Sequence, residues 1–105
     1  MIDIFVSSRL ASPQVDVFPS NQTVPEGKTT NISCKASGVP KPTVSWSFEN
    51  GGLPSGATVK NTEKESLLQL PDTIKDMEGA YKCTAKNRVG EAEAISTLHV
   101  IGVPF

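Results

Sequence analysis

The side chains best suited to chemistry in this sequence are two cysteines, one histidine and one pair of closely spaced carboxylates. Cys34 and Cys83 lie far apart and His99 is the only histidine, so the closely spaced set of about four ligands that a zinc site needs is missing. His99 is expected on the outward face of the last strand, away from any nucleophile that it could activate. Asp76 and Glu78 are expected on a surface corner, as solvated charges rather than an acid–base pair. We therefore expect no catalytic residue, no metal site and no cofactor.

Two N-x-[ST] triplets, NQT at 21–23 and NIS at 31–33, are potential acceptor sites for N-linked glycans. With five asparagines in the chain, about one such triplet is expected by chance, so the count alone says little. Asn31 alternates with apolar neighbours and is expected to face solvent. Asn21 is expected in an exposed polar link between the first two strand segments. Both are candidate glycosylation sites, and two unmodified surface asparagines are the alternative.

The composition excludes several classes of function. The chain has 105 residues, enough for one domain, and ten basic against eleven acidic residues give a net charge of -1. The basic stripe of a nucleic-acid-binding protein is absent. The longest apolar run is IFV at 4–6, so this segment does not insert into a bilayer. Asp3 stands where a signal peptide needs positive charge, so if the protein is secreted, its signal lies upstream or has been removed.

Several short segments alternate apolar and polar residues with a period of two. The clearest are TNISC (30–34), TVSWSF (43–48) and AYKCTA (80–85), and LLQL (67–70) and TLHV (97–100) offer inward-facing apolar pairs. Glycine, proline and asparagine clusters separate them. Short strands about ten residues apart predict an all-β antiparallel sandwich or barrel. For the two cysteines, a free buried pair and a disulfide both fit this pattern.

The chain from about Pro13 to Val100 resembles an immunoglobulin domain of the intermediate (I-set) type. Trp46 follows Cys34 by twelve residues and Tyr81 precedes Cys83 by two, the Cys…Trp…Cys and Tyr-x-Cys spacing of immunoglobulin sandwiches. The other matches are the segments VPEG, CKASGVPKPTVSW and GAYKCTAKNRVG. The last of these contains the family's C-x-A-x-N-x-x-G pattern, whose Asn87 and Gly90 suit a tight turn with positive φ.

The resemblance implies a two-sheet antiparallel Greek-key sandwich with one disulfide, Cys34–Cys83, between the sheets. It implies that the Trp46 indole packs on the sulfur atoms and that the Tyr81 hydroxyl bonds to the backbone at the corner before its strand. Leu70 completes the expected core signature. By the chain-entropy model the disulfide stabilises the fold by about 4 kcal/mol.

One position departs from the family pattern D-x-G-x-Y-x-C. Met77 stands where the aspartate is usual, with Asp76 and Glu78 on either side, and Ile74 falls one place later than the usual apolar plug. Either the corner is shifted by one residue or its charged anchor is missing.

The sequence divides into a domain at 13–101, an N-terminal extension at 1–12 and a short linker at 102–105. The extension is the tail of a preceding domain, a linker or residues added for expression. Its apolar alternation at 2–6 could also pair with a strand edge of another copy.

The resemblance implies a non-catalytic extracellular module of a cell-adhesion molecule, receptor ectodomain or matrix protein, which binds other proteins, among them other immunoglobulin domains. A glycan at Asn31 would cover one sheet and leave the opposite face to a partner. Lys82, Lys86, Arg88 and His99 are the candidate partner-facing residues. Without an aromatic anchor on that face, we expect weak or no homodimer. A basic cluster that touches an acidic glycan is a further hypothesis, with solvated lysines as its alternative.

The expected location is extracellular or the cell surface, where a disulfide persists. The alternative is a cytoplasmic structural spacer of a muscle or cytoskeletal protein.

Overall fold

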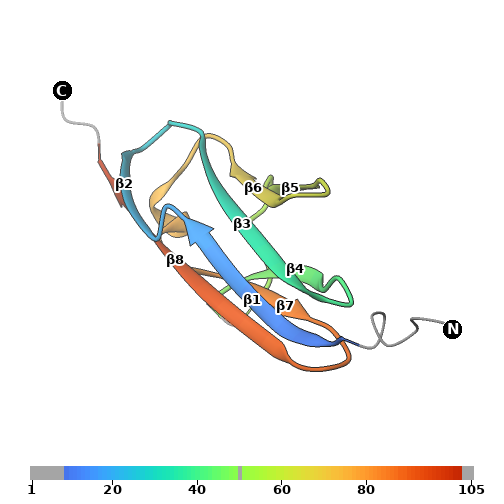
Figure 1. The fold of residues 1–105 in the computed structure, drawn as a ribbon. Coiled ribbons are helices and arrows are strands. Elements are labelled where there is room, and N and C mark those ends of the chain that lie inside the picture. Colours follow the sequence, from blue (N-terminus) through green and yellow to red (C-terminus); the bar gives the residue numbers. More distant parts are fainter. Residues whose placement is uncertain (1–8, 50, 103–105) are drawn as a thin grey trace, which may run out of the picture.

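The computed structural model describes residues 9–49 and 51–102, which form two packed β-sheets (Figure 1). Their strands are β1 Ala11–Phe18, β2 Asn21–Pro25, β3 Thr30–Val39, β4 Thr43–Phe48, β5 Thr58–Asn61, β6 Ser66–Leu70, β7 Gly79–Lys86 and β8 Glu91–Ile101, with a 3-10 turn, η2, at Lys75–Met77. β1 begins at one end of the sandwich and β8 ends at the other (Figure 1). The strands run from residue 11 to residue 101. The predicted strand pairing of residues 2–6 falls outside the described residues.

The sheets have the strand orders β1-β3-β6-β5 and β2-β8-β7-β4. This confirms the all-β sandwich, and all pairs but one are antiparallel. The exception is β2, which runs parallel to β8, with Asn21 opposite Thr97 and Pro25 opposite Ile101. The reason lies between β1 and β2, where the chain leaves the first sheet at Phe18 and joins the second without reversing its direction. The carbonyl of Ser20 already accepts a hydrogen bond from the Thr97 N–H, at 3.0 Å.

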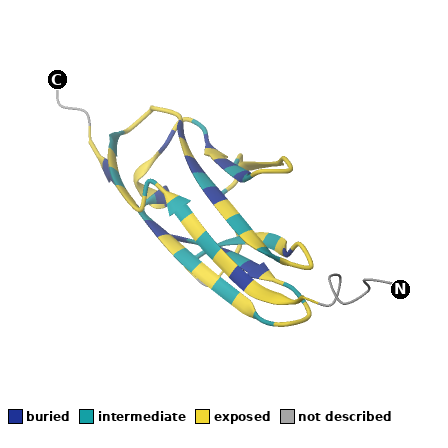
Figure 2. Ribbon diagram, in the orientation of Figure 1, coloured by how far each residue is buried: buried dark blue, intermediate teal, exposed yellow. Residues whose placement is uncertain are grey.

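The core lies between the sheets and is formed by the alternate residues that the sequence pattern placed inward. Figure 2 shows this alternation of buried and exposed positions along β3. The fully buried residues of the central cluster include Leu70 and Tyr81, whose ring stacks on Phe48 with centroids 4.5 Å apart. The other members of the cluster are Ile32, Leu68, Met77, Leu98 and Val100. Aliphatic and aromatic side chains of this kind each stabilise the fold by about 1.5–3 kcal/mol when fully buried.

Cys34 of β3 and Cys83 of β7 form the predicted disulfide between the two sheets, with their Cα atoms 6.5 Å apart. Trp46 stands opposite Cys83 in the register of β4 and β7. Its indole Nε1 donates a hydrogen bond of 2.9 Å to Oγ of Ser66, on the other sheet. The only tryptophan therefore joins the two sheets by a polar contact beside the disulfide.

The turn between β7 and β8 is formed differently from the expectation. Neither Asn87 nor Gly90 has positive φ. Instead, Oδ1 of Asn87 accepts hydrogen bonds from the N–H groups of Val89 and Gly90, at 2.9 and 3.1 Å. Gly90 lies close to β1, and a Cβ there would lie 2.6 Å from the Ser12 hydroxyl oxygen, which would have to rotate away. A side-chain cap, rather than left-handed backbone, thus explains Asn87.

In the described part of the chain, no helix has the length and apolarity needed to cross a bilayer.

Candidate functional site

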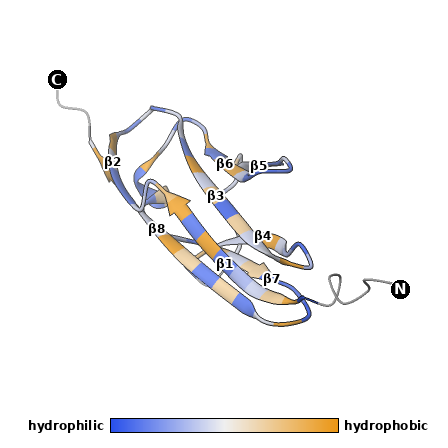
Figure 3. Cartoon of the chain, in the orientation of Figure 1, coloured by the Kyte–Doolittle hydropathy of each residue, from blue (hydrophilic) through white to orange (hydrophobic). Residues whose placement is uncertain are grey.

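The outward face of the β2-β8-β7-β4 sheet, here called the β8 face, carries most of the residues predicted to meet a partner. Residues 80–86 of β7 and 91–101 of β8 alternate, so that every second side chain points away from the other sheet. The register places these side chains in rows across β4, β7 and β8. Figure 3 shows how hydrophilic and hydrophobic residues, inward and outward together, follow one another along β8. The outward residues of β4, β7 and β8 are Thr43, Ser45, Ser47, Ala80, Lys82, Thr84, Lys86, Glu91, Glu93, Ile95, Thr97, His99 and Ile101.

The charges on the β8 face are arranged in opposite pairs. Nζ of Lys82 lies 3.6 Å from a carboxylate oxygen of Glu93, and Lys86 stands opposite Glu91 in the register. Each lysine of β7 therefore has an acidic neighbour on β8, and the field of this region is close to balanced. An exposed pair of this kind contributes about 0–1 kcal/mol to stability. The arrangement favours solvated, balanced lysines over a basic cluster for acidic glycans.

Arg88 and His99 lie at opposite ends of β8. Arg88 is exposed in the turn before the strand begins, and His99 is exposed near its end, opposite Thr23 of β2. The four residues predicted to face a partner are thus spread along the whole face.

Ile95 is an outward apolar residue of this face that the sequence analysis did not name. It is 53% exposed and stands opposite Lys82, and together with Glu49 and Ala80 these residues line an open hollow. The signal was present, because Ile95 has the same parity in its strand as His99, which is expected to face outward. An exposed aliphatic side chain among balanced charges has the composition of a small interface centre with a polar rim.

The corner between β6 and β7 forms the predicted tyrosine contact. The Tyr81 hydroxyl donates a hydrogen bond of 2.6 Å to the carbonyl of Met77. Burial, with a smaller contribution from the Glu49 carboxylate, raises the pKa of Tyr81 to about 12. Met77, in the place of the usual aspartate, is buried in the core. The apolar-plug position is taken by the fully buried Thr73, while Ile74 is 49% exposed.

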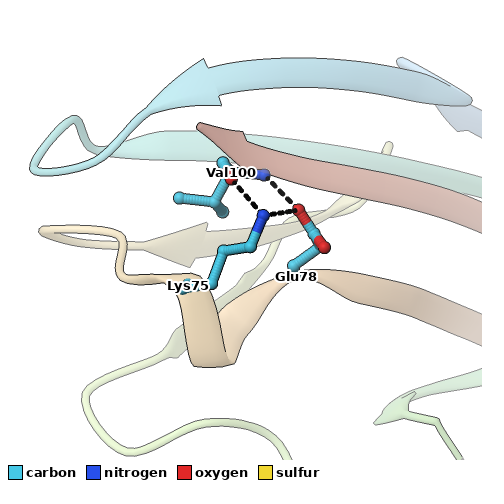
Figure 4. A network of polar contacts seen from close by, with 3 residues as sticks. All are labelled: Lys75, Glu78 and Val100. Atoms are coloured by element: carbon cyan, nitrogen blue, oxygen red, sulfur yellow. Dashed lines mark hydrogen bonds and ion pairs between the residues drawn. The ribbon is translucent and has the colours of Figure 1, made fainter. Parts of the chain in front are cut away.

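Glu78 supplies a charged anchor for this corner, one residue after the usual position (Figure 4). Its Oε1 accepts a hydrogen bond of 2.9 Å from the Val100 N–H and lies 3.0 Å from Nζ of Lys75. Lys75 in turn donates to the Val100 carbonyl at 2.9 Å. The Val100 N–H and then Lys75 hold the pKa of Glu78 below its ordinary value of 4.5. The expected alternatives of a shifted corner and a missing anchor are thereby resolved: the tyrosine contact is in place and the anchor has moved to Glu78.

The two N-x-[ST] triplets lie on different sheets. Asn31 is exposed on β3, on the side away from the buried Ile32, as predicted. Asn21 is exposed too, but it is the first residue of β2 rather than part of a link, and it stands opposite Thr97 at the edge of the β8 face. Each carboxamide is therefore accessible, and the two belong to opposite faces of the sandwich.

A second hollow, of about 190 Å³, lies at the open side of the sandwich between the start of β4 and the loop from β5 to β6. Its wall includes Lys41, which donates a hydrogen bond of 3.3 Å to the carbonyl of Glu63. Within residues 9–49 and 51–102, no three His, Cys, Asp or Glu side chains come together in a way that could hold a metal ion.

Comparison with known proteins agrees with this geometry. The family model described as Immunoglobulin I-set domain matches residues 13–100. The chain is 36% identical over 90 residues to the mouse (Mus musculus) basement membrane-specific heparan sulfate proteoglycan core protein, covering 86% of this chain and 2% of the relative. It is 37% identical over 86 residues to human (Homo sapiens) Roundabout homolog 2, covering 82% and 6%. It is 32% identical over 93 residues to rat (Rattus norvegicus) contactin-5, covering 88% and 8%. This chain thus spans only a small part of these relatives.

Among solved structures, a chimeric titin Z1Z2 superposes with a TM-score of 0.82 at 25% identity, covering 90% of this chain and 99% of that one. An immunoglobulin domain from the complex of titin M10 with obscurin-like 1 superposes with a TM-score of 0.80 at 27% identity, covering 90% and 99%. The disulfide, the tyrosine contact, the strand order and the family match agree, and the chain belongs to the immunoglobulin I-set family.

Proposed function

We propose that this domain is a non-catalytic protein-interaction module of an extracellular adhesion molecule, receptor ectodomain or matrix protein. The observation that carries the proposal is Ile95, a half-exposed aliphatic side chain beside the Lys82–Glu93 pair at the centre of a sheet face. Apolar centres with polar rims are the usual composition of protein interfaces. The solved neighbours include titin immunoglobulin domains in complexes with obscurin-like 1 and with telethonin, so this fold binds both immunoglobulin domains and other proteins.

The extracellular location is supported by the disulfide, by two accessible N-x-[ST] triplets and by a relative that is named after the basement membrane. The two termini of the folded part lie at opposite ends (Figure 1), which suits a domain that spaces its neighbours along a longer chain. Asn21 and Asn31 are the proposed glycosylation sites.

The first test is the intact mass of the chain after secretion from animal cells with an added signal peptide, before and after removal of N-glycans. Glycans at Asn21 or Asn31 and thiols that react only after reduction are the expected results. An unmodified chain with reactive thiols would remove the extracellular proposal. The second candidate, a cytoplasmic structural spacer, would then be favoured, with the likeness to titin domains as its support.

The second test concerns the β8 face. The secreted domain, multimerised to raise avidity, is screened against a panel of secreted immunoglobulin-type ectodomains, with Ile95→Arg and Val39→Arg as a matched pair. Val39 is a suitable control because it is 48% exposed at the end of β3, on the outward side of the other sheet. We expect Ile95→Arg to abolish binding that Val39→Arg leaves intact. Equal loss with both variants, or with neither, would contradict the assignment of this face. Sedimentation of the unmultimerised domain as a monomer is expected as well.

A further inference from the structure

We infer that Phe18 is the platform on which the first sugar of an Asn31-linked glycan packs. The inference rests on the proposed extracellular location, and it assigns a role to the most exposed of the large apolar side chains recorded for the described residues. Phe18 is 76% exposed at the end of β1.

The register of β1 and β3 places Phe18 close to Asn31 on one face. Phe18 stands directly opposite Ser33, two residues along β3 from Asn31. Ile32 and Cys34 are fully buried, so Asn31 and Ser33 point outward together, and Val17 packs on the core, so Phe18 points outward with them. Diagonal neighbours of this kind in an antiparallel pair lie about 7–8 Å apart, within reach of an aromatic ring.

The surroundings of Asn31 leave room for a sugar. In the next strand, Gln69 of β6 is opposite Asn31 and is exposed. Half-buried Leu67 stands opposite Ser33 on its other side. Ser33 itself is held down by a hydrogen bond from its hydroxyl to the Glu65 carboxylate. Asn31 thus has an apolar diagonal neighbour in each adjacent strand, Phe18 in β1 and Leu67 in β6.

A sugar attached to Asn31 has a surface that is complementary to the ring of Phe18. During attachment, the side-chain nitrogen of Asn31 forms a bond to the anomeric carbon of N-acetylglucosamine. The bond from that carbon to a lipid pyrophosphate breaks, and the amide loses one proton to the transferring enzyme. The attached ring has one face of C–H groups, which can lie on the face of an aromatic side chain and remove both from water. Asn21 is the competing site, three residues after Phe18 in sequence, but it belongs to the other sheet.

The test compares glycoforms of the secreted domain that carries Asn21→Gln, so that only Asn31 can be modified. The glycan is trimmed by an endoglycosidase to a single N-acetylglucosamine, and the melting temperature is compared with that of the variant Asn21→Gln/Asn31→Gln. We expect the single sugar to raise the melting temperature in the presence of Phe18 and to have little effect in Phe18→Ser. Ile95→Ser, a half-exposed aliphatic residue on the opposite face, is the control and should keep the full effect. Proton NMR should show ring-current shifts of the sugar protons that Phe18→Ser removes.

The outcomes separate this inference from the proposed function. A chain unmodified at Asn31 would overturn this inference, and modification of Asn21 alone would still leave the extracellular proposal standing. A modified Asn31 whose stabilising effect does not change in Phe18→Ser would overturn the inference alone. The reciprocal background, Asn31→Gln, leaves only Asn21 open to modification. If the sugar raises the melting temperature in a Phe18-dependent way only in that background, the choice of Asn31 is overturned.

Discussion

The carboxylate of Glu78 accepts a hydrogen bond of 2.9 Å from the backbone N–H of Val100. This contact joins the corner before β7 to the end of β8, 22 positions later in the chain. Because Lys75 bonds both to Glu78 and to the Val100 carbonyl, three residues close a small polar ring at the end where β8 leaves the domain.

Glu78→Gln should destabilise the domain at neutral pH, because the charged acceptor of the Val100 N–H is lost. The pKa of Glu78 is lowered in the folded state, so its contribution is fully present above the ordinary value of 4.5 and is lost as the pH falls through the folded pKa. Denaturant unfolding from pH 7 to pH 2 should show the two proteins converging at the acid end. Asp76→Asn is the control, since Asp76 has no hydrogen-bond partner among the described residues. A difference that is constant with pH would contradict this account.

Tyr81→Phe should lower the free energy of unfolding by about 1–3 kcal/mol, because the buried Met77 carbonyl loses its hydrogen-bond donor while the ring can still stack on Phe48. Urea unfolding at pH 7 measures this loss. An unchanged free energy of unfolding would show that the corner does not depend on the hydroxyl.

The same residue predicts a dependence on alkaline pH. The pKa of Tyr81 is raised from 10.0 to about 12, so its contribution is fully present below pH 10 and is lost as the pH rises through about 12. Tyr81 is the only tyrosine, so phenolate absorbance reports its ionisation directly. We expect it to ionise only near pH 12 or on unfolding, and ionisation near pH 10 in the folded protein would refute the assignment.

Asn87→Asp should destabilise the N-terminal end of β1 while preserving the turn from β7 to β8. The Asn87 amide nitrogen donates to the carbonyls of Ala11 and Pro40, at 3.0 and 2.9 Å, and aspartate cannot donate these bonds. Aspartate retains the oxygen that caps the turn. Two lost hydrogen bonds predict a decrease of about 1–3 kcal/mol, and Asn87→Ala should lose more. Hydrogen exchange should show faster exchange in β1 with Asn87→Asp, and in the turn only with Asn87→Ala. Equal behaviour of the two variants would argue against separate roles for the two ends of this amide.

Replacing Cys34 and Cys83 by alanine should lower the free energy of unfolding by about 2–4 kcal/mol, because a crosslink over a separation of 49 residues no longer restricts the unfolded chain. Reduction of the wild type should give a similar loss. The fluorescence of Trp46, the only tryptophan, should increase on reduction if its indole packs on the sulfur atoms as predicted, because disulfides quench indole emission. Unchanged emission from a folded, reduced protein would place the indole away from the sulfurs.

The all-β sandwich could be predicted from the residue pattern, and the disulfide and the tyrosine contact from the family resemblance. Alternation with period two reports which side of a strand is buried, and the spacing of Cys34, Trp46, Tyr81 and Cys83 is specific to one fold. The same alternation along residues 91–101 also predicts that Ile95 points outward.

Which distant segments of the chain meet could be seen only in the folded molecule. Three contacts join residues that no local pattern connects. Glu78 accepts a hydrogen bond from Val100, and Asn87 donates hydrogen bonds to Ala11 and Pro40. Asn21 pairs with Thr97 in a parallel register. A local pattern fixes the direction of a side chain relative to its own strand, whereas the partner across a sheet depends on register and on where the chain changes sheets. For that reason Phe18 and Asn31, thirteen residues apart in sequence, become neighbours only when β1 is aligned with β3.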